Sequence, residues 1–172
     1  MMKQKRIRQI VLSALFCALV FSMTWIMVPL PTGNVNLGDG ALLLCAWLLG
    51  GPWAAASAAL GATLCDLASG FAAYAPGTFL IKALMVFTVL LIQKGGSKLR
   101  LAPRLQRILS AVGAELVMIL GYFVYEATFL SYGLAAAASI PFNAIQGGFA
   151  ILVSCLVYEL LSHAGFSPNQ KQ

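Results

Sequence analysis

The sequence predicts an all-α, polytopic membrane protein of six transmembrane helices with both termini in the cytoplasm. Of the 172 residues, 60% are apolar and only 9% are charged, whereas a soluble domain carries roughly 25% charged residues. The mean hydropathy of +0.89 describes the chain as a whole. At about 20 residues per crossing, the length admits about six helices and leaves no room for a soluble domain. We therefore expect a single transmembrane domain over residues 1–172.

The first predicted helix covers residues 9–28 and follows a basic start at residues 3–8. A basic start before an apolar run can also mark a cleaved secretory signal. Here the apolar run has no A-x-A-like cleavage site before Pro29, which such a signal would need. We therefore expect this segment to stay in the protein as its first helix.

The second and third predicted helices, at residues 41–50 and 52–69, form a tight hairpin. Glycines that end a helix, followed by a proline suited to the first turn of the next, are typical of such a connection. Gly50, Gly51 and Pro52 supply this pattern. Because residues 41–50 are too few to cross an ideal bilayer, we expect the second helix to take in part of a loop or to span a thinned region.

The last three predicted helices cover residues 78–93, 107–130 and 141–161, and the basic residues orient the whole set. Lys and Arg gather on the cytoplasmic side of membrane proteins. All of them except Lys82 fall into clusters that share one side when both termini are cytoplasmic. The loops at 29–40, 70–77 and 131–140 then face outward and contain no Lys or Arg. The clustered residues are Lys3, Lys5, Arg6 and Arg8, then Lys94, Lys98, Arg100, Arg104 and Arg107, and finally Lys171.

Polar side chains of the predicted helices collect in the outer third of the membrane. Charged groups inside a membrane are costly and mark a functional site by default. With a rise of 1.5 Å per residue, Asp66, Lys82 and Glu126 all fall at this outer level, beneath the outward loops. The pattern predicts a polar pocket that opens to the outside. The substrate-binding residues that we expect are Glu126, Lys82, Asn143, Gln146, Tyr74, Asp39, Asn36 and Trp25.

Structural alternatives stay open for several of these residues. Asp66 and Lys82 can neutralise each other and so hold their helices together. Asp66 and Glu126, however, carry two negative charges against the single ammonium of Lys82, which leaves a surplus negative charge. Glu126 is the carboxylate that we expect to face the ligand. Asn143 and Gln146 lie on one helix face and can instead serve interhelical hydrogen bonds.

The aromatic residues and a deeper carboxylate also have two interpretations. Trp25 fits the aromatic belt of a membrane interface as well as a pocket wall, whereas Tyr74 lies in a loop whose glycines and proline indicate a shaped turn. Glu115 is three turns before Glu126 on nearly the same face of its helix. That spacing suits a proton relay, although contact with a neighbouring helix explains it equally simply.

Several classes of function are excluded by what the sequence lacks. The four cysteines lie inside apolar stretches without C-x-x-C spacing, so neither a disulfide framework nor a zinc site is predicted. No phosphate-binding loop and no H-E-x-x-H motif occurs, and the single His163 lies near the C-terminus. The positions of the basic residues beside apolar runs argue against nucleic acid. We expect binding or transport, with no enzymatic activity, no cofactor and no metal.

Three segments together resemble the substrate-binding S components of energy-coupling factor (ECF) transporters. The first is ALFCA at residues 14–18, which is similar to an A-x-x-x-A coupling motif of that family. The second is NLGDG at residues 36–40, which opens the second helix. The third is Asp66 followed by YAPGTFLIK at residues 74–82. The six-helix plan of the family extends over almost the whole chain, so the resemblance implies one transmembrane S-component domain.

The resemblance implies a high-affinity binding subunit for uptake of a water-soluble vitamin or vitamin precursor in a bacterial cell membrane. Its partners would be a transmembrane coupling protein, against which Ala14 and Ala18 would pack, and two cytoplasmic ATPase subunits. The loop at residues 29–40 would act as a lid. A pyridoxine-like or hydroxymethylpyrimidine-like ligand is our expectation, with riboflavin, thiamine and pantothenate open.

The alternative of a different class is a self-sufficient, proton-coupled small-molecule carrier that uses Glu115 and Glu126. Such carriers often contain inverted repeats, and none is convincing in this sequence. A membrane enzyme acting on lipid headgroups would need paired carboxylates near the basic cytoplasmic loop, and these are absent from the sequence.

Overall fold

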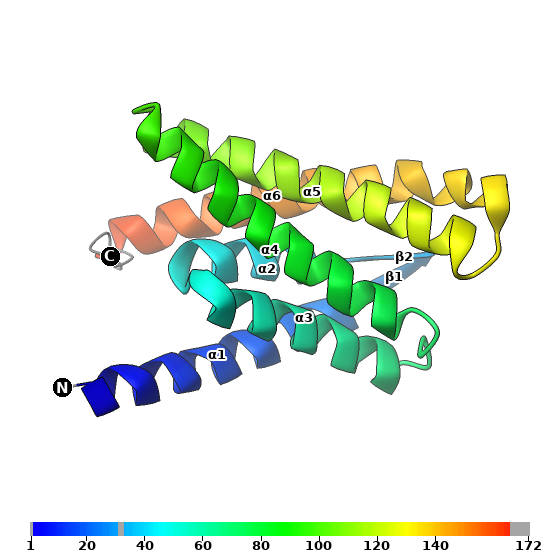
Figure 1. Cartoon of the computed structure of the whole chain (residues 1–172), viewed down its shortest axis with the longest axis horizontal. Coiled ribbons are helices and arrows are strands. Elements are labelled where there is room, and N and C mark those ends of the chain that lie inside the picture. Colours follow the sequence, from blue (N-terminus) through cyan, green and yellow to red (C-terminus); the bar gives the residue numbers. More distant parts are fainter. Residues whose placement is uncertain (1, 31–32, 166–172) are drawn as a thin grey trace.

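The computed structural model describes residues 2–30 and 33–165 and confirms the predicted helical membrane architecture. Six α-helices are joined by short connections, one β-hairpin and one 3₁₀ helix (Figure 1). The elements are α1 (Met2–Trp25), β1 (Met27–Leu30), β2 (Gly33–Asn36), α2 (Gly38–Leu48), α3 (Gly51–Ala68), α4 (Ala75–Lys98), α5 (Pro103–Thr128), η1 (Gly133–Ser139) and α6 (Ile140–His163).

The short helix α2 lies at the centre of the bundle and contacts α1, α3, α4 and α6. Its residues from Gly38 to Trp47 are all buried. A helix that is apolar on every side belongs in an interior, which explains why α2 shows no polar face in the sequence. Because protein surrounds it, α2 does not need the length of a lipid-exposed crossing.

The turn between α2 and α3 has the predicted hairpin form. Gly50 and Gly51 adopt φ angles of +65° and +62°, a region that glycine enters without steric cost. Pro52 then occupies the first turn of α3. These two helices therefore reverse direction within the space of a few residues, and α3 can line the bundle beside α1 and α4.

The bundle has two chemically different ends. In Figure 1 the start of α1, the end of α4, the start of α5 and the end of α6 lie at one end. The hairpin, the α3–α4 turn and η1 lie toward the other. The basic clusters before α1 and between α4 and α5 thus share one end, as an even number of crossings requires. Lys171 lies outside the described residues, and the assignment of that end to the cytoplasm stays a prediction.

The hairpin is a feature that the sequence analysis did not predict. We expected a first helix over residues 9–28, but α1 ends at Trp25 and the chain continues as β1. Val28 pairs with Val35 in an antiparallel register that runs from Met27↔Asn36 to Leu30↔Gly33. Proline at position 29 cannot continue a helix, and β-branched valines favour extended backbone. Residues 31–32, within the predicted lid, lie outside the described residues.

Two further boundaries differ from the sequence-based expectation. Helix α4 extends past residue 93 to Lys98 because Gly95 and Gly96 stay helical. A Cβ atom at Gly96 would come within 2.8 Å of Gln106 Cγ, so glycine there lets the last turn of α4 contact the start of α5. The loop predicted at 131–140 contains the 3₁₀ helix η1, which begins at Gly133 with a φ of +56°.

The outer surface of the bundle suits a lipid environment. Many large apolar side chains are exposed around it, among them Leu15, Leu91, Leu120 and Leu156. Within the described residues, four helical segments are long and apolar enough to cross a membrane, at Arg6–Trp25, Ala75–Lys98, Pro103–Thr128 and Gly133–His163. The chain is a multi-pass membrane protein.

Ion pairs at the basic end tie α5 to α6. Glu159 accepts hydrogen bonds from Arg104 at 3.2 Å and from Arg107 at 2.9 Å. The Arg107 guanidinium also lies 4.3 Å from the centre of the Tyr158 ring. This cluster is partly exposed and belongs to the end opposite the hairpin, so it anchors the helices without contributing to the site described next.

Candidate ligand-binding pocket

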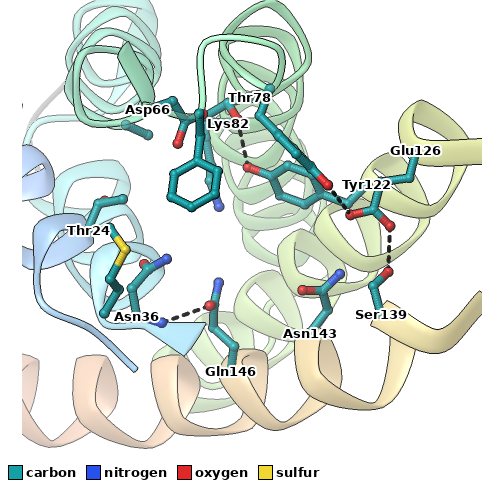
Figure 2. Close-up of a pocket in the computed structure, with 14 residues that line it drawn as sticks. Thr24, Asn36, Asp66, Thr78, Lys82, Tyr122, Glu126, Ser139, Asn143 and Gln146 are labelled. Carbon is teal, nitrogen blue, oxygen red and sulfur yellow. Dashed lines mark hydrogen bonds between the residues drawn. The ribbon is translucent and has the colours of Figure 1, made fainter. Parts of the chain in front are cut away.

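A polar cavity lies between the helices at the hairpin end of the bundle (Figure 2). It encloses about 770 Å³ of empty space, a figure that includes the open solvent at its mouth. Side chains from all the helices except α2 line it, together with the hairpin and the α3–α4 turn. The lining residues are Thr24, Met27, Asn36, Ala62, Asp66, Phe71, Tyr74, Thr78, Lys82, Tyr122, Glu126, Ser139, Asn143 and Gln146.

The floor of the cavity is a buried ion pair between Lys82 of α4 and Asp39 of α2. Their side chains are 7% and 0% exposed. Asp39 lies in the first turn of α2, where the helix dipole stabilises a negative charge. Our expectation that Lys82 could pair with Asp66 is replaced by this geometry, because no ion pair joins those two side chains among the described residues. Lys82 nevertheless lines the cavity, whereas Asp39 lies directly behind it.

Gln146 connects this ion pair to the hairpin. Its side-chain nitrogen donates to Asp39 Oδ2 at 2.6 Å, and its side-chain oxygen accepts from the backbone N–H of Asn36 at 2.9 Å. Asn36 in turn accepts a hydrogen bond from the N–H of Gly38 through its side-chain oxygen at 2.9 Å. The start of α2, the hairpin and α6 are therefore held in one hydrogen-bonded network beside the cavity.

Glu126 on α5 forms a second polar group across the cavity. Its carboxylate accepts a hydrogen bond from Ser139 of η1 at 2.7 Å and a long one from the Tyr74 hydroxyl at 3.5 Å. Glu126 is only 6% exposed. Burial raises the pKa of the Tyr74 phenol, and the neighbouring Glu126 charge raises it further. Tyr74 is thus a neutral donor, and Glu126 connects α5 to both the α3–α4 turn and η1.

Asp66 on α3 also lines the cavity. One of its carboxylate oxygens, Oδ2, is buried and has no hydrogen-bond partner among the described residues. Such a buried acceptor is costly when left unpaired. Thr78 of α4 and Tyr122 of α5 line the cavity as well, and their hydroxyls lie 3.0 Å apart. The walls formed by α3, α4 and α5 are therefore polar.

The cavity contains most of the residues that the sequence analysis proposed. Glu126, Lys82, Asn143, Gln146, Tyr74 and Asn36 all line it. Trp25 does not, since its side chain is 48% exposed and stacks on Phe21 with ring centres 5.7 Å apart. Its placement suits the interfacial belt that we kept as the alternative.

Several lining residues were missed, although helical spacing could have indicated two of them. Thr78 precedes Lys82 by one turn of α4, and Tyr122 precedes Glu126 by one turn of α5. Residues four apart share a helix face, so each belongs on the same wall as the charged residue that follows it. No comparable signal marks Ser139, whose position depends on the unpredicted helix η1.

Glu115 on α5 is buried deeper than the cavity. It is 3% exposed, and neither carboxylate oxygen has a hydrogen-bond partner among the described residues. It packs against α6 at Gly147, where a Cβ atom would come within 3.0 Å of Glu115 Oε2. It does not line the cavity, and its contact with α6 agrees with the helix-contact alternative, while its unpartnered oxygens keep the proton-relay alternative open.

Alanines repeat every four residues on α1 and on α3, and the two sets differ in exposure. Ala54, Ala58 and Ala62 on α3 are buried within the bundle, and they serve the internal contacts that such stripes most often make. Ala14 and Ala18 on α1 are exposed. The flat stripe of α1 therefore remains available on the outer surface of the protein.

Comparison with known proteins agrees with this architecture. The family model described as "ECF-type riboflavin transporter, S component" matches residues 4–163. A solved structure described as "Structure and mechanism of the S component of a bacterial ECF transporter" superposes with a TM-score of 0.74. It is 22% identical in sequence, and the alignment covers 92% of this chain and 97% of that one, which shows a shared fold. No curated protein matches the chain.

Proposed function

The chain belongs to the family of ECF-type riboflavin transporter S components, and from this premise we propose that its polar cavity captures a small, water-soluble ring vitamin or vitamin precursor. As an S component, the protein is a substrate-binding subunit for vitamin uptake in a membrane. The observation that carries the proposal is the cavity itself, with polar side chains that converge on it from α1, the hairpin and α3 to α6. We place the protein in a bacterial cell membrane, with the cavity open to the outside.

The residues that we assign to ligand binding are those of the cavity wall, Glu126 and Asn143 among them. Lys82 and Gln146 act as contacts whose positions are set by Asp39 behind them. The wall combines many hydrogen-bonding side chains with a few apolar ones, Met27, Ala62 and Phe71, and convergent polar groups fix the orientation of a bound small molecule. A pyridoxine-like or hydroxymethylpyrimidine-like molecule fits this chemistry, and the name of the family makes riboflavin the second candidate.

Transport would require partners. We propose that Ala14 and Ala18 on α1 contact a transmembrane coupling protein that carries two cytoplasmic ATPase subunits. The exposure of this small-residue stripe supports the proposal, since small side chains let helix backbones approach closely in a membrane. The chain itself has no phosphate-binding loop, so ATP hydrolysis must take place in another subunit.

The test of the binding function is equilibrium titration of the purified protein in detergent without ATP. The panel contains pyridoxine, hydroxymethylpyrimidine, riboflavin, thiamine and pantothenate. One of these should bind tightly and with one molecule per chain. Failure of a folded, ligand-free preparation to bind any member would contradict the proposal.

The buried carboxylate of Glu115 favours one second candidate, a proton-coupled carrier that works alone. Buried carboxylates without partners occur in proton relays, and Glu115 is such a group. Liposomes that contain only this protein separate the two functions. A subunit that needs partners shows no uptake under a pH gradient, whereas a self-sufficient carrier accumulates the vitamin, and Glu115→Gln abolishes that accumulation.

A further inference from the structure

Helix α4 carries a continuous row of exposed side chains along one face, which we call the α4 stripe. Its members recur every three or four residues, a spacing that places them on the same side of a helix. The first part of the stripe is apolar and between 46% and 69% exposed. It then continues into two exposed lysines. The stripe consists of Leu80, Leu84, Phe87, Leu91, Lys94 and Lys98.

The length of the α4 stripe matches the hydrocarbon layer of a membrane. From Leu80 to Lys98 a helix rises about 27 Å, and the hydrocarbon core of a bilayer is about 30 Å thick. The two lysines lie at the end of the bundle that α4 shares with the start of α5 (Figure 1). A lysine at such a position lays its carbon chain along apolar surface and places its ammonium at headgroup level.

The positive charges of Lys94 and Lys98 are not neutralised within the described part of the chain. Neither lysine takes part in an ion pair there. The acidic residue at this end of the bundle is Glu159, and Arg104 and Arg107 already hold its carboxylate. The other acidic residues of the chain lie at or beneath the cavity. An anion that pairs with the two lysines must therefore come from outside the described residues.

Helix α6 shows that an apolar stripe alone does not distinguish α4. Ile145, Phe149, Leu152 and Leu156 are 53% to 58% exposed and have the same spacing of three or four residues. This row ends at the same end of the bundle without a Lys or Arg, since the basic side chain in the last turn of α6 is His163. Both helices suit lipid chains, but only the α4 stripe joins its apolar surface to two lysines.

The turn after the α4 stripe adds a third positive charge. Arg100 adopts a φ of +53°, and its N–H donates to the backbone oxygen of Ser97 at 3.2 Å. Gln106 of α5 accepts a hydrogen bond from the Ser97 hydroxyl at 3.3 Å and donates to the Leu101 oxygen at 2.7 Å. These contacts hold the turn in a defined shape beside Lys98.

We propose that the α4 stripe is a binding site for an anionic phospholipid of the leaflet at the basic end of the bundle. The lipid phosphate accepts hydrogen bonds from the ammonium groups of Lys94 and Lys98, and an acyl chain lies along Leu91 and the apolar residues before it. A soluble anion would cover only the lysines, whereas a phospholipid covers both parts of the stripe. The site lies on the outer surface and does not depend on the vitamin-binding function of the cavity.

The experiment is native mass spectrometry of the purified protein in detergent, titrated with phosphatidylglycerol or with phosphatidylcholine of identical acyl chains. Each basic residue near a membrane surface strengthens the binding of anionic lipid about fivefold. Phosphatidylglycerol should therefore bind at least about tenfold more tightly than phosphatidylcholine, and salt should weaken this preference. Equal binding of the two lipids would overturn the proposal.

A third titration identifies the source of the anion. Glycerophosphoglycerol is the headgroup of phosphatidylglycerol without its acyl chains. At equal concentration it should not displace the lipid, because it makes no contact with the apolar part of the α4 stripe. If it binds as tightly as phosphatidylglycerol, the lysines bind soluble anions and the proposal of a lipid site is wrong.

Two single variants test the position of the site. Lys98→Gln should lower the affinity for phosphatidylglycerol about fivefold and leave that for phosphatidylcholine unchanged. Arg104→Gln is the matched control, because it removes one positive charge at the same end from a side chain that Glu159 holds, and it should change neither affinity. Equal losses in the two variants would show attraction to the overall charge of this end and would overturn a site on α4.

The double variant Lys94→Gln/Lys98→Gln should lose the preference for phosphatidylglycerol almost completely. Both lysines are exposed and lie outside the cavity, so the variant should keep the wild-type unfolding temperature in detergent and the wild-type affinity for vitamin. A folded double variant that keeps the lipid preference would overturn the proposal. If the variant fails to fold, the comparison of the two lipids and the free headgroup on the wild-type protein decides the question.

Discussion

Lys82 forms a buried ion pair with Asp39 at the wall of the cavity. Its position early in the fourth predicted helix placed it in the membrane and predicted a polar site, and it lines the cavity. Its partner could not be predicted in the same way. Asp39 was assigned to a loop, and only the burial of α2 at the centre of the bundle brings its carboxylate to the Lys82 ammonium.

The first prediction concerns this ion pair. Asp39→Asn leaves the Lys82 ammonium buried without a counter-ion, and removing one member of a buried pair typically costs about 3–5 kcal/mol. We expect a clear fall in the thermal unfolding temperature of the protein in detergent. The double variant Asp39→Leu/Lys82→Met removes both charges and should recover much of the loss. An unchanged unfolding temperature for Asp39→Asn would contradict the buried pair.

The second prediction concerns Glu126. Glu126→Gln keeps the size of the side chain but removes a charge that accepts from Ser139 and Tyr74. We expect vitamin affinity to fall by about tenfold, since hydrogen bonds to charged groups contribute about 1.5–3 kcal/mol. Isothermal titration calorimetry provides the measurement. Glu115→Gln lies outside the cavity and serves as the control that should retain affinity; a folded Glu126→Gln protein with wild-type affinity would refute the assignment.

At the scale of elements, α2 and the hairpin show the limits of hydropathy patterns. The sequence predicted α2 as a helix too short to cross alone, and the structure explains the shortness by burial on all sides. The hairpin was missed because its strands are only four residues long. Neither the apolar MVPL of β1 nor the polar GNVN of β2 is long enough to show a periodicity that could separate a strand from a helix end or a loop.

The third prediction belongs to α1. Replacing Ala14 and Ala18 with Leu should abolish ATP-driven uptake in the complete transporter while vitamin binding by the purified subunit is unchanged, because both residues are exposed and lie outside the cavity. Uptake of radiolabelled vitamin by cells, together with titration of the purified variant, provides the measurement.

A matched control lies on α3, where Ala58 repeats the small-residue spacing but is 0% exposed. Ala58→Leu adds bulk inside the bundle and should destabilise the fold by about 1–3 kcal/mol, so binding and uptake should fall together. If the α1 variant also loses binding, its stripe serves contacts within the subunit and not with a partner.

At the scale of the whole molecule, charge and hydropathy predicted the architecture better than the bounds and contacts of single elements. Six helices, the common end of the basic clusters and the polar pocket at the opposite end all followed from where charged residues fall along the chain. The roles within the pocket could not follow, because they depend on lateral contacts between helices. Trp25 and Asp39 were both expected to contact the ligand, yet Trp25 faces outward and Asp39 is buried behind the cavity wall.

The fourth prediction concerns orientation in the membrane. A single cysteine introduced at Leu134, which is 88% exposed on η1, should react with a membrane-impermeant thiol reagent in intact cells. A cysteine introduced at Lys98, at the end of α4, should react only after the cells are permeabilised. The native cysteines are first replaced by alanine or serine. The reverse pattern would show that the cavity opens toward the cytoplasm.

The most direct test of a vitamin-binding cavity is native mass spectrometry of the protein purified from cells grown with B vitamins. The account predicts one vitamin molecule per chain, released on unfolding and depleted in the Glu126→Gln protein. A folded wild-type protein that carries no vitamin, or a vitamin that stays bound to Glu126→Gln as firmly as to the wild-type protein, would contradict it.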